Sequence, residues 1–164
     1  MSYTLTDTQP GHLPGLYACF DEVAREKRYL GFTEAPPWPD FVVRHESLLR
    51  AGCPHVVLLD GETVLGWCDI GPLPGQSRAH IGVLGMALLP RVRGQGWGGQ
   101  LLRAAVDRGW AHGFTRIELT VRADNERARQ LYERFGFEHE GLRRRGSCID
   151  GEYQDVHAMA LLKG

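Results

Sequence analysis

Apolar residues in the second half of the chain alternate between the two spacings that distinguish strands from helices. Ile117, Leu119 and Val121 are separated by polar residues, which is the period of two of a strand with one buried face. Helical spacing follows in other segments, and a strand–helix–strand–helix order favours at least one parallel strand pair with a helical crossover. The predicted elements are a strand at 80–89, a helix at 97–112, a strand at 116–121, a helix at 125–135 and a hairpin of 137–148 and 153–162 that turns at Asp150-Gly151.

The first half of the chain predicts two helices followed by a second hairpin. Residues 13–30 carry apolar residues at roughly helical spacing, and prolines at 36, 37 and 39 then interrupt the chain. A second helix is expected from Asp40, ending before Gly52. Its expected buried face is Phe41, Val42, Leu48 and Leu49. The expected strands are 3–6, 55–59 and 63–70, with a tight turn at Asp60-Gly61 between the last two.

Length and charge narrow the classes of protein that the chain could belong to. It has 164 residues, which suits a single domain over 1–164, and a formal net charge of -1. Acidic and basic residues are interspersed, so neither nucleic acid nor a membrane is expected as a partner. The basic run Arg143-Arg144-Arg145 is interpreted as a solvated face of the final hairpin.

Hydropathy, cysteines and histidines give no sign of a membrane span or a metal site. No apolar stretch approaches the roughly 20 residues that cross a bilayer, and the N-terminus lacks a signal-peptide core, so a cytoplasmic location is expected. The four cysteines have no C-x-x-C spacing, which suits buried reduced thiols. The seven histidines form no paired motif, so no metal is expected unless distant segments assemble a site.

A glycine-rich stretch at 91–99 lies between a predicted strand and a predicted helix. Such a loop leaves backbone NH groups free to converge on a phosphate, and the helix dipole favours negative charge there. A P-loop is excluded because Gly99 is followed by Gln100 and Leu101 instead of Lys and Ser or Thr. A dinucleotide fingerprint is disfavoured, because residues 90–93 separate the loop from its strand and too little chain remains for a doubly wound sheet.

The loop and the segments after it together resemble a known family. Arg91-x-x-Gly94-x-Gly96 is similar to the acyl-CoA pyrophosphate loop of the GCN5-related N-acetyltransferase (GNAT) family. The family's second signature is matched by 117–121, Asn125 and the run Leu-Tyr-Glu-Arg-Phe-Gly-Phe at 131–137. The resemblance implies an α+β GNAT fold: a mostly antiparallel mixed sheet of about seven strands with one parallel splayed pair, flanked by about four helices. It also implies acceptor-side helices at 10–51, an acetyl-CoA-binding core at 80–137 and a C-terminal hairpin at 137–162.

The family resemblance implies that acetyl-CoA is the cosubstrate and assigns residues to its binding. The strand before the loop would pair with the pantetheine arm and polarise the thioester carbonyl through its backbone. Gly82 and Gly85 in that strand either help it bend or allow close packing. The implied binding residues are Met86, Ala87, Leu88, Arg91, Arg93, Gly94, Gln95, Gly96, Trp97, Gly98, Gly99, Asn125 and Tyr132.

Three residues are candidates for proton transfer during direct attack of an amine on the thioester. Tyr132 matches the family's tyrosine, whose phenol donates a proton to the departing thiolate. The base that deprotonates the amine is left open between His80, which matches the glutamate of histone acetyltransferases, and Glu118 on the next strand. A water chain could connect either to the amine, and Cys68 beside Asp69 keeps a covalent route open.

The last third of the chain is similar to a single-domain bacterial branch that includes amino-acid, ribosomal-protein and spermidine acetyltransferases. A small primary amine is the expected acceptor, since Tyr29, Phe32, Trp38 and Trp67 could form an aromatic pocket, although core packing explains them equally well. A protein N-terminus is the alternative acceptor, and a non-catalytic acyl-CoA sensor is the alternative class of function. Homodimers are common in the family, so a homodimer is also possible here.

Overall fold

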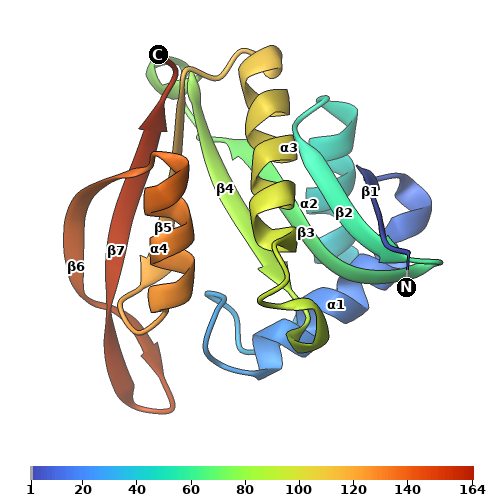
Figure 1. Cartoon of the computed structure of the whole chain (residues 1–164), viewed down its shortest axis with the longest axis horizontal. Coiled ribbons are helices and arrows are strands. Elements are labelled where there is room, and N and C mark those ends of the chain that lie inside the picture. The colour runs from blue at the N-terminus through green and yellow to red at the C-terminus, as the bar shows by residue number, and fades with distance from the viewer. Residues whose placement is uncertain (1) are drawn as a thin grey trace.

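A computed structural model describes residues 2–164 of the chain and contains one seven-stranded sheet (Figure 1). The strand order is β1-β2-β3-β4-β5-β7-β6. Neighbouring strands are antiparallel except β4 and β5, which are parallel, as predicted for the mixed sheet. The strands are β1 (Thr4–Asp7), β2 (His55–Asp60), β3 (Thr63–Pro72), β4 (Ile81–Leu88), β5 (Arg116–Arg122), β6 (Glu138–Ile149) and β7 (Glu152–Leu162).

Four helices cover the two faces of this sheet, again as predicted. In Figure 1, α3 and α4 lie on the face toward the viewer and α1 and α2 lie behind it. The apolar side of each helix packs on the sheet, as the fully buried Leu101 and Leu102 of α3 and Leu16 of α1 illustrate. No helix within residues 2–164 is both long and apolar enough to cross a membrane. The helices are α1 (Leu13–Arg25), α2 (Trp38–Arg50), α3 (Trp97–His112) and α4 (Glu126–Phe135), with short 3-10 turns at Pro10–His12, Gln76–Arg78 and Pro90–Val92.

The first helix is shorter than predicted. It ends at Arg25 instead of near residue 30, because Lys27 has a φ of 57°, a left-handed conformation that does not continue an α-helix. The carbonyl of Lys27 accepts a hydrogen bond of 3.1 Å from Arg122, and its ammonium pairs with Asp150 at 3.0 Å. Both partners come from the far end of the chain, so the local pattern could not reveal this turn. As a result Tyr29 lies in the loop between α1 and α2.

The second helix begins slightly earlier than predicted and buries one unexpected residue. It starts at Trp38 instead of Asp40, because a proline such as Pro39 is tolerated in the first turn of a helix. The prediction for its inward face was partly wrong, because a histidine shares that face with the apolar residues. Phe41 and Leu48 are buried, Val42 and Leu49 are partly buried, and His45 is buried with 4% of its surface exposed.

The first strand of the final hairpin, β6, is an edge strand of the sheet. Arg143-Arg144-Arg145 in β6 is exposed, which confirms its interpretation as a solvated face. Cys148 is also exposed, so the expectation of buried thiols was wrong for this cysteine, because one side of an edge strand has no neighbour to cover it. The other three cysteines are buried. At the turn, Asp150 and Gly151 have φ values of 52° and 80°, as a tight two-residue hairpin requires.

Close packing explains one of the two glycines that interrupt β4. A Cβ at Gly82 would come within 2.9 Å of the Phe114 ring, so this position has no room for a side chain. Gly85 is different, because the nearest heavy atom to a Cβ there would be a carboxylate oxygen of Asp69 at 4.0 Å. Gly82 therefore serves packing, whereas Gly85 leaves open space beside a buried acid.

Gly66 of β3 is expected to be the most sensitive glycine for stability. A Cβ at this position would overlap the Leu88 side chain and lie 2.8 Å from the carbonyl oxygen of Ala87. Gly66→Ala should therefore lower the free energy of unfolding by about 1–3 kcal/mol, measured by urea denaturation. The control is Gly141→Ala, where a Cβ meets no atom within 4 Å. Equal unfolding midpoints for the two variants would contradict this prediction.

Candidate functional site

The parallel strands β4 and β5 part halfway along the sheet and leave a cleft. Their pairing covers only Ile81–Arg116, Gly82–Ile117 and Val83–Glu118. Beyond these pairs β4 stays paired with β3, and β5 stays paired with β7. The facing edges then offer backbone NH and C=O groups to a ligand, because a strand edge without a partner strand keeps its hydrogen-bonding capacity. The cleft has a volume of about 550 Å³. The two strands that part to form it, β4 and β5, are the predicted splayed pair.

The glycine loop closes one end of the cleft. Gly94 and Gly96 have φ values of 73° and 87°, which glycine adopts without strain. Gly96 immediately precedes α3, and a Cβ there would meet no atom within 4 Å, so the space above the helix N-terminus is open. The NH groups of the first helical turn have no partners inside the helix and favour an anion. The loop therefore has the geometry of a phosphate cradle.

Most of the residues predicted to bind the cosubstrate lie around this cleft, but three do not line it. Trp97 packs edge-on against Tyr3, with ring centroids 5.8 Å apart. Gln95 donates a hydrogen bond of 3.0 Å to the carbonyl of Arg91, and both side chains are exposed. The residues that do line the cleft are Met86, Ala87, Leu88, Arg93, Gly94, Gly96, Gly98, Gly99, Asn125 and Tyr132.

Arg93 connects the glycine loop to two other walls of the cleft. Its Nε donates to the carbonyl of Leu88 at 2.9 Å, and its two terminal nitrogens donate to Glu26 at 2.9 and 2.6 Å. The guanidinium also lies 4.4 Å from the centre of the Tyr29 ring. Because these contacts engage most of its donors, Arg93 fixes the end of β4 and the loop after α1 in position.

Tyr132 and Asn125 reach the cleft from α4. Asn125 caps the helix by accepting a hydrogen bond of 3.3 Å from the NH of Ala128, as predicted, and it also lines the cleft. Tyr132 is 7% exposed. Burial raises the pKa of the Tyr132 phenol above its ordinary value, because the charged phenolate is disfavoured away from water. The phenol therefore stays protonated near neutral pH and can donate a proton.

His80 is not brought to the cleft. It is exposed, just before β4, and its carbonyl accepts hydrogen bonds from Thr115 and Arg116 at the paired end of the two strands. The cleft lining on β4 begins at Leu84. Four strand residues span about 13 Å, so the imidazole is far from the middle of the cleft.

Glu118 lies at the point where the strands part, but its side chain is engaged. Arg116 donates to it from Nε at 3.0 Å, and the same guanidinium donates to Glu140 at 2.9 and 2.6 Å. Glu118 is absent from the residues that line the cleft, whereas its neighbours Leu119 and Thr120 belong to them. The structure therefore places this carboxylate in an ion pair beside the cleft and not in its lining.

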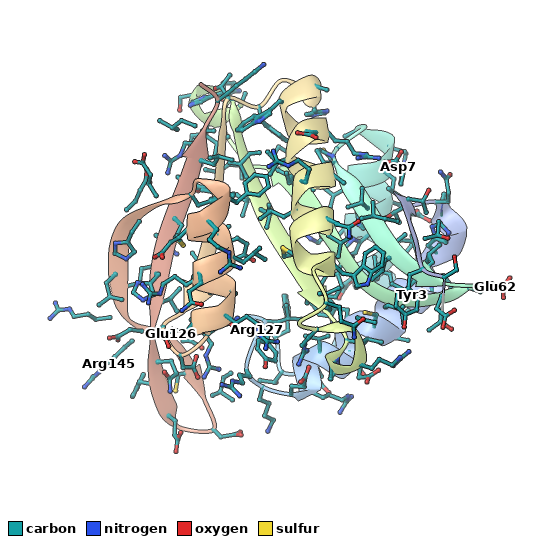
Figure 2. The ribbon with its side chains drawn as sticks, in the orientation of Figure 1. Tyr3, Asp7, Glu62, Glu126, Arg127 and Arg145 are labelled. Carbon is teal, nitrogen blue, oxygen red and sulfur yellow. The ribbon has the colours of Figure 1, made fainter. Side chains whose placement is uncertain are left out.

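Several residues of the cleft escaped the sequence-based prediction. A Cβ at Gly94 would lie 3.6 Å from a terminal nitrogen of Arg127, and Figure 2 shows Arg127 between α4 and the glycine loop. Arg127 and Arg134 are seven residues apart on α4, so they share one side of the helix, and this spacing beside Asn125 was an available signal. Tyr29, which the sequence offered for an aromatic pocket, does line the cleft. The missed lining residues are Leu30, Gly31, Leu84, Gly85, Leu119, Thr120, Val121, Arg127, Ala128, Leu131 and Arg134.

Distant segments do assemble one group of possible metal ligands. Ligand atoms of His45, His55 and Asp69 lie within 4.8 Å of one another, and all three residues are buried. However, His45 Nδ1 and His55 Nε2 are 2.9 Å apart, which is the length of a hydrogen bond. Two nitrogens on one tetrahedral zinc ion would lie about 3.3 Å apart, given Zn–N bonds of about 2.05 Å. The two imidazoles are therefore placed to form a hydrogen bond with each other and not to share a metal ion.

Comparison with known proteins identifies relatives over most of the chain. The model of the acetyltransferase (GNAT) family matches residues 16–137. The L-amino acid N-acetyltransferase AaaT of Escherichia coli is 29% identical over 143 residues, which cover 85% of this chain and 87% of that protein. The N-alpha-acetyltransferase RimI of Mycobacterium tuberculosis is 30% identical over 145 residues, covering 88% and 89% of the two chains.

Solved structures share the fold at lower sequence identity. A phosphinothricin acetyltransferase of Sinorhizobium meliloti, solved with AcCoA, superposes with a TM-score of 0.90 at 23% identity, covering 100% of this chain and 90% of that one. A GNAT-family acetyltransferase of Streptococcus pneumoniae gives a TM-score of 0.89 at 23% identity, covering 98% and 99% of the two chains. At these identities the agreement concerns the fold alone.

Proposed function

Because the chain belongs to the acetyltransferase (GNAT) family, we propose that it transfers the acetyl group of acetyl-CoA to the primary amine of a small molecule by direct attack. The parting of β4 and β5 beside the glycine loop is the observation that supports this most strongly. It combines a phosphate cradle with unpaired backbone edges in one cleft. A ligand that matches this combination has a phosphate at one end and an amide-containing arm that can pair with a strand edge.

Each wall of the cleft has a separate task in this proposal. The glycine loop and the first turn of α3 hold the pyrophosphate, and Arg127 adds positive charge above the loop. The edge of β4 at 85–88 hydrogen-bonds the pantetheine arm and polarises the thioester carbonyl. Tyr132 donates a proton to the sulfur that leaves. The thioester supplies the acetyl group when it is bound.

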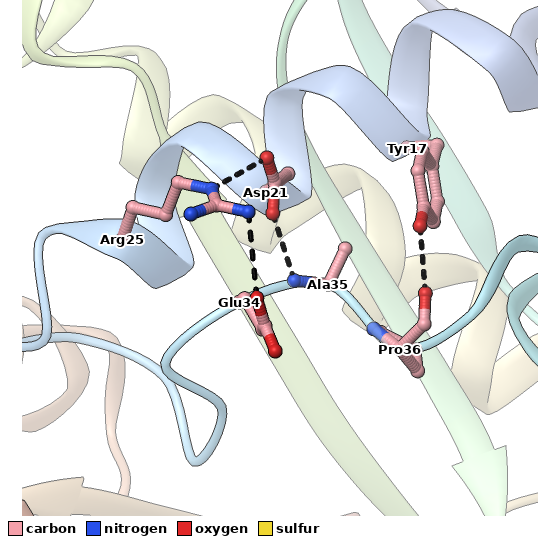
Figure 3. A network of polar contacts seen from close by, with 6 residues as sticks. All are labelled: Tyr17, Asp21, Arg25, Glu34, Ala35 and Pro36. Carbon is pink, nitrogen blue, oxygen red and sulfur yellow. Dashed lines mark hydrogen bonds and ion pairs between the residues drawn. The ribbon is translucent and has the colours of Figure 1, made fainter.

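The loop between α1 and α2 would form the acceptor side of the site, and it is firmly held (Figure 3). Asp21 accepts hydrogen bonds from Arg25 at 2.8 Å and from the NH of Ala35 at 2.9 Å, and Arg25 reaches Glu34 at 3.5 Å. The Tyr17 hydroxyl donates to the carbonyl of Pro36 at 2.8 Å. A fixed loop can select an acceptor by shape, because it loses little entropy on binding.

Aromatic side chains beside this loop favour an amine with an apolar or aromatic body, such as an amino acid or a xenobiotic amine. Phe20 contacts both Phe32 and Trp67, with ring centroids 5.6 and 5.5 Å apart. Phe32 is 52% exposed and Trp38 is 41% exposed, which leaves aromatic surface free for contact. The alternative acceptor is a protein N-terminus, which the name of the relative RimI favours. A homodimer and a cytoplasmic location stay predictions from the sequence.

Calorimetry and an amine screen test this proposal. We expect the protein to bind acetyl-CoA and to release free thiol in the presence of at least one amine from a panel of amino acids, apolar xenobiotic amines, polyamines and N-terminal peptides. The acetylated product is identified by mass spectrometry. NADH serves as the control ligand and should not bind. Binding without release of thiol from any amine would instead favour an acyl-CoA sensor, and turnover of peptides alone would favour the N-terminal acetyltransferase.

A further inference from the structure

A buried carboxylate lies directly behind the wall of the cleft. Asp69 of β3 is paired with Gly85 of β4, and Gly85 lines the cleft. The Oδ1 atom of Asp69 is 4.0 Å from the position that a Cβ at Gly85 would occupy, so no side chain screens it there. Asp69 is 6% exposed. A charged group is rarely buried at such a position without a role, because its desolvation is costly.

This carboxylate points toward the side of the sheet that carries α1 and α2. A Cβ at Gly71, two residues further along β3, would lie 3.1 Å from Leu48 of α2, and alternate residues of a strand share a face. On the other side of the sheet, a Cβ at Gly98 of α3 would lie 3.8 Å from Met86 and 3.8 Å from Leu88. Asp69 is therefore on the same side as the loop proposed to contact the acceptor, opposite α3.

The surroundings of Asp69 favour proton uptake near neutral pH. Burial raises the pKa of Asp69 to about 6, while the charge of Arg44 and a hydrogen bond from Trp67 act in the opposite direction. The other titratable groups near it are His45 on α2, His55 on β2 and the thiols of Cys53 and Cys68. Burial raises the pKa of both thiols, so they stay protonated and neutral.

A chain of hydrogen bonds begins at His45, close to this carboxylate, and ends at a second opening of the molecule. His45 Nδ1 and His55 Nε2 are 2.9 Å apart, and His55 Nδ1 is 2.7 Å from Thr8 Oγ1. Asp69 lies within 4.8 Å of the two imidazoles, a gap that one water molecule can bridge. Thr8 and His55 line a groove of about 470 Å³ together with Asp7 and Arg108.

Both imidazoles are suited to passing a proton because they are neutral. Burial lowers the pKa of His45 to about 4 and that of His55 to about 3. A neutral imidazole has one NH and one free nitrogen, so it can accept a proton on one side and release another on the opposite side. The separation of their nitrogens also favours a hydrogen bond over a shared metal ion, as described above.

We propose that Asp69 accepts the proton of the acceptor amine and that His45, His55 and Thr8 carry it to the groove beside Asp7. The inference rests on the proposed acetyl transfer. As the amine nitrogen bonds to the acetyl carbon, its N–H bond breaks and the proton moves to the Asp69 carboxylate, directly or through one water. As His45 takes this proton on its other nitrogen, its Nδ1 proton moves to His55 Nε2, and the Nδ1 proton of His55 moves to Thr8 Oγ1. The Thr8 hydroxyl proton leaves for solvent, so each group of the chain ends neutral and no oxidant or reductant is needed.

The decisive comparison is Asp69→Asn with the matched control Asp60→Asn, which changes an exposed residue at the turn of the same hairpin. With an amine that the wild type acetylates, we expect Asp69→Asn to lower kcat by about 10²–10³-fold and Asp60→Asn to leave it unchanged. The affinity for acetyl-CoA, measured by calorimetry, should stay within about twofold in both variants, which shows that each is folded. A wild-type rate retained by Asp69→Asn contradicts the inference and leaves the proposed function standing.

The pH profile of the wild type tests the same residue without a substitution. The base must be deprotonated, so kcat should fall as the pH drops through about 6, the pKa of Asp69 in the folded protein. The pH profile of Asp69→Asn should lack this fall in kcat at low pH. A flat wild-type profile between pH 5 and 7 contradicts the inference even if the variant does not fold. A wild type that acetylates no amine contradicts the proposed function itself, together with this inference.

The exit path has its own test at Thr8. Thr8→Val removes the hydroxyl at almost constant volume, and Thr8→Ser keeps it. We expect Thr8→Val to lower kcat about tenfold at low buffer concentration, with recovery as imidazole buffer is added, because external buffer can then remove the proton. Thr8→Ser should behave as the wild type. A rate for Thr8→Val that is unchanged, or that is lowered but insensitive to buffer, contradicts the path through Thr8.

Discussion

Tyr132→Phe is expected to lower kcat for acetyl transfer by about 10²–10³-fold while the affinity for acetyl-CoA stays nearly unchanged. The substitution removes only the phenolic OH, so the packing of the ring against Phe137, with centroids 5.7 Å apart, is kept. Without a proton donor the sulfur must leave as a thiolate. Because burial raises the pKa of Tyr132, the wild type should keep its donor as the pH rises above neutral.

Single-turnover kinetics with bound acetyl-CoA measure this effect most directly, since they separate the chemical step from product release. The matched control is Tyr153→Phe, the same substitution at a tyrosine of β7 that is 58% exposed. It should leave the rate unchanged. If Tyr132→Phe loses less than about threefold, Tyr132 is a packing residue and the proton donor is another group.

Gly96→Val is expected to weaken acetyl-CoA binding by about 100-fold, because the loop must rearrange to accept the new residue. The φ of Gly96 is 87°, which a β-branched residue adopts only with strain. The NH groups ahead of α3 would then no longer converge on the pyrophosphate, and the valine would occupy the open space above the helix. Isothermal titration calorimetry measures the change.

Gly113→Val separates this effect from a general loss of stability. Gly113 lies at the opposite end of α3, has a φ of 115° and offers a new Cβ no contact within 4 Å. Both variants should lower the melting temperature, because both force valine into a left-handed conformation. Only Gly96→Val should also lower the affinity for acetyl-CoA. Similar affinities in the two variants would show that the loop does not hold the pyrophosphate.

Sequence patterns were sufficient for the elements whose signals are local. The period of two at 117–121 and the glycines at both ends of α3 correspond to β5 and to the bounds of that helix. The parallel pair followed from the order of elements, because a strand, a helix and a strand in succession constrain the connection. The phosphate-binding loop could be predicted from the sequence because its glycines act through their own backbone NH groups.

The parts of the site that the sequence did not reveal depend on contacts between distant segments. Tyr29 reaches the cleft because the turn at Lys27 is fixed by Arg122 and Asp150, which lie about a hundred residues away. Asp69 faces Gly85 only through the register of β3 against β4. His80 matches a family position but lies outside the cleft lining, because family similarity does not fix where a side chain points.

The short pairing of β4 with β5 divides the sheet into two parts, β1-β2-β3-β4 and β5-β7-β6, which are joined at one end only. Three residue pairs join the strands at that end. Beyond it the segment after α1 links the two parts, because Glu26 pairs with Arg93 and the carbonyl of Lys27 accepts a hydrogen bond from Arg122 of β5. Substitutions at those positions can therefore change the gap without disturbing any ladder of backbone hydrogen bonds.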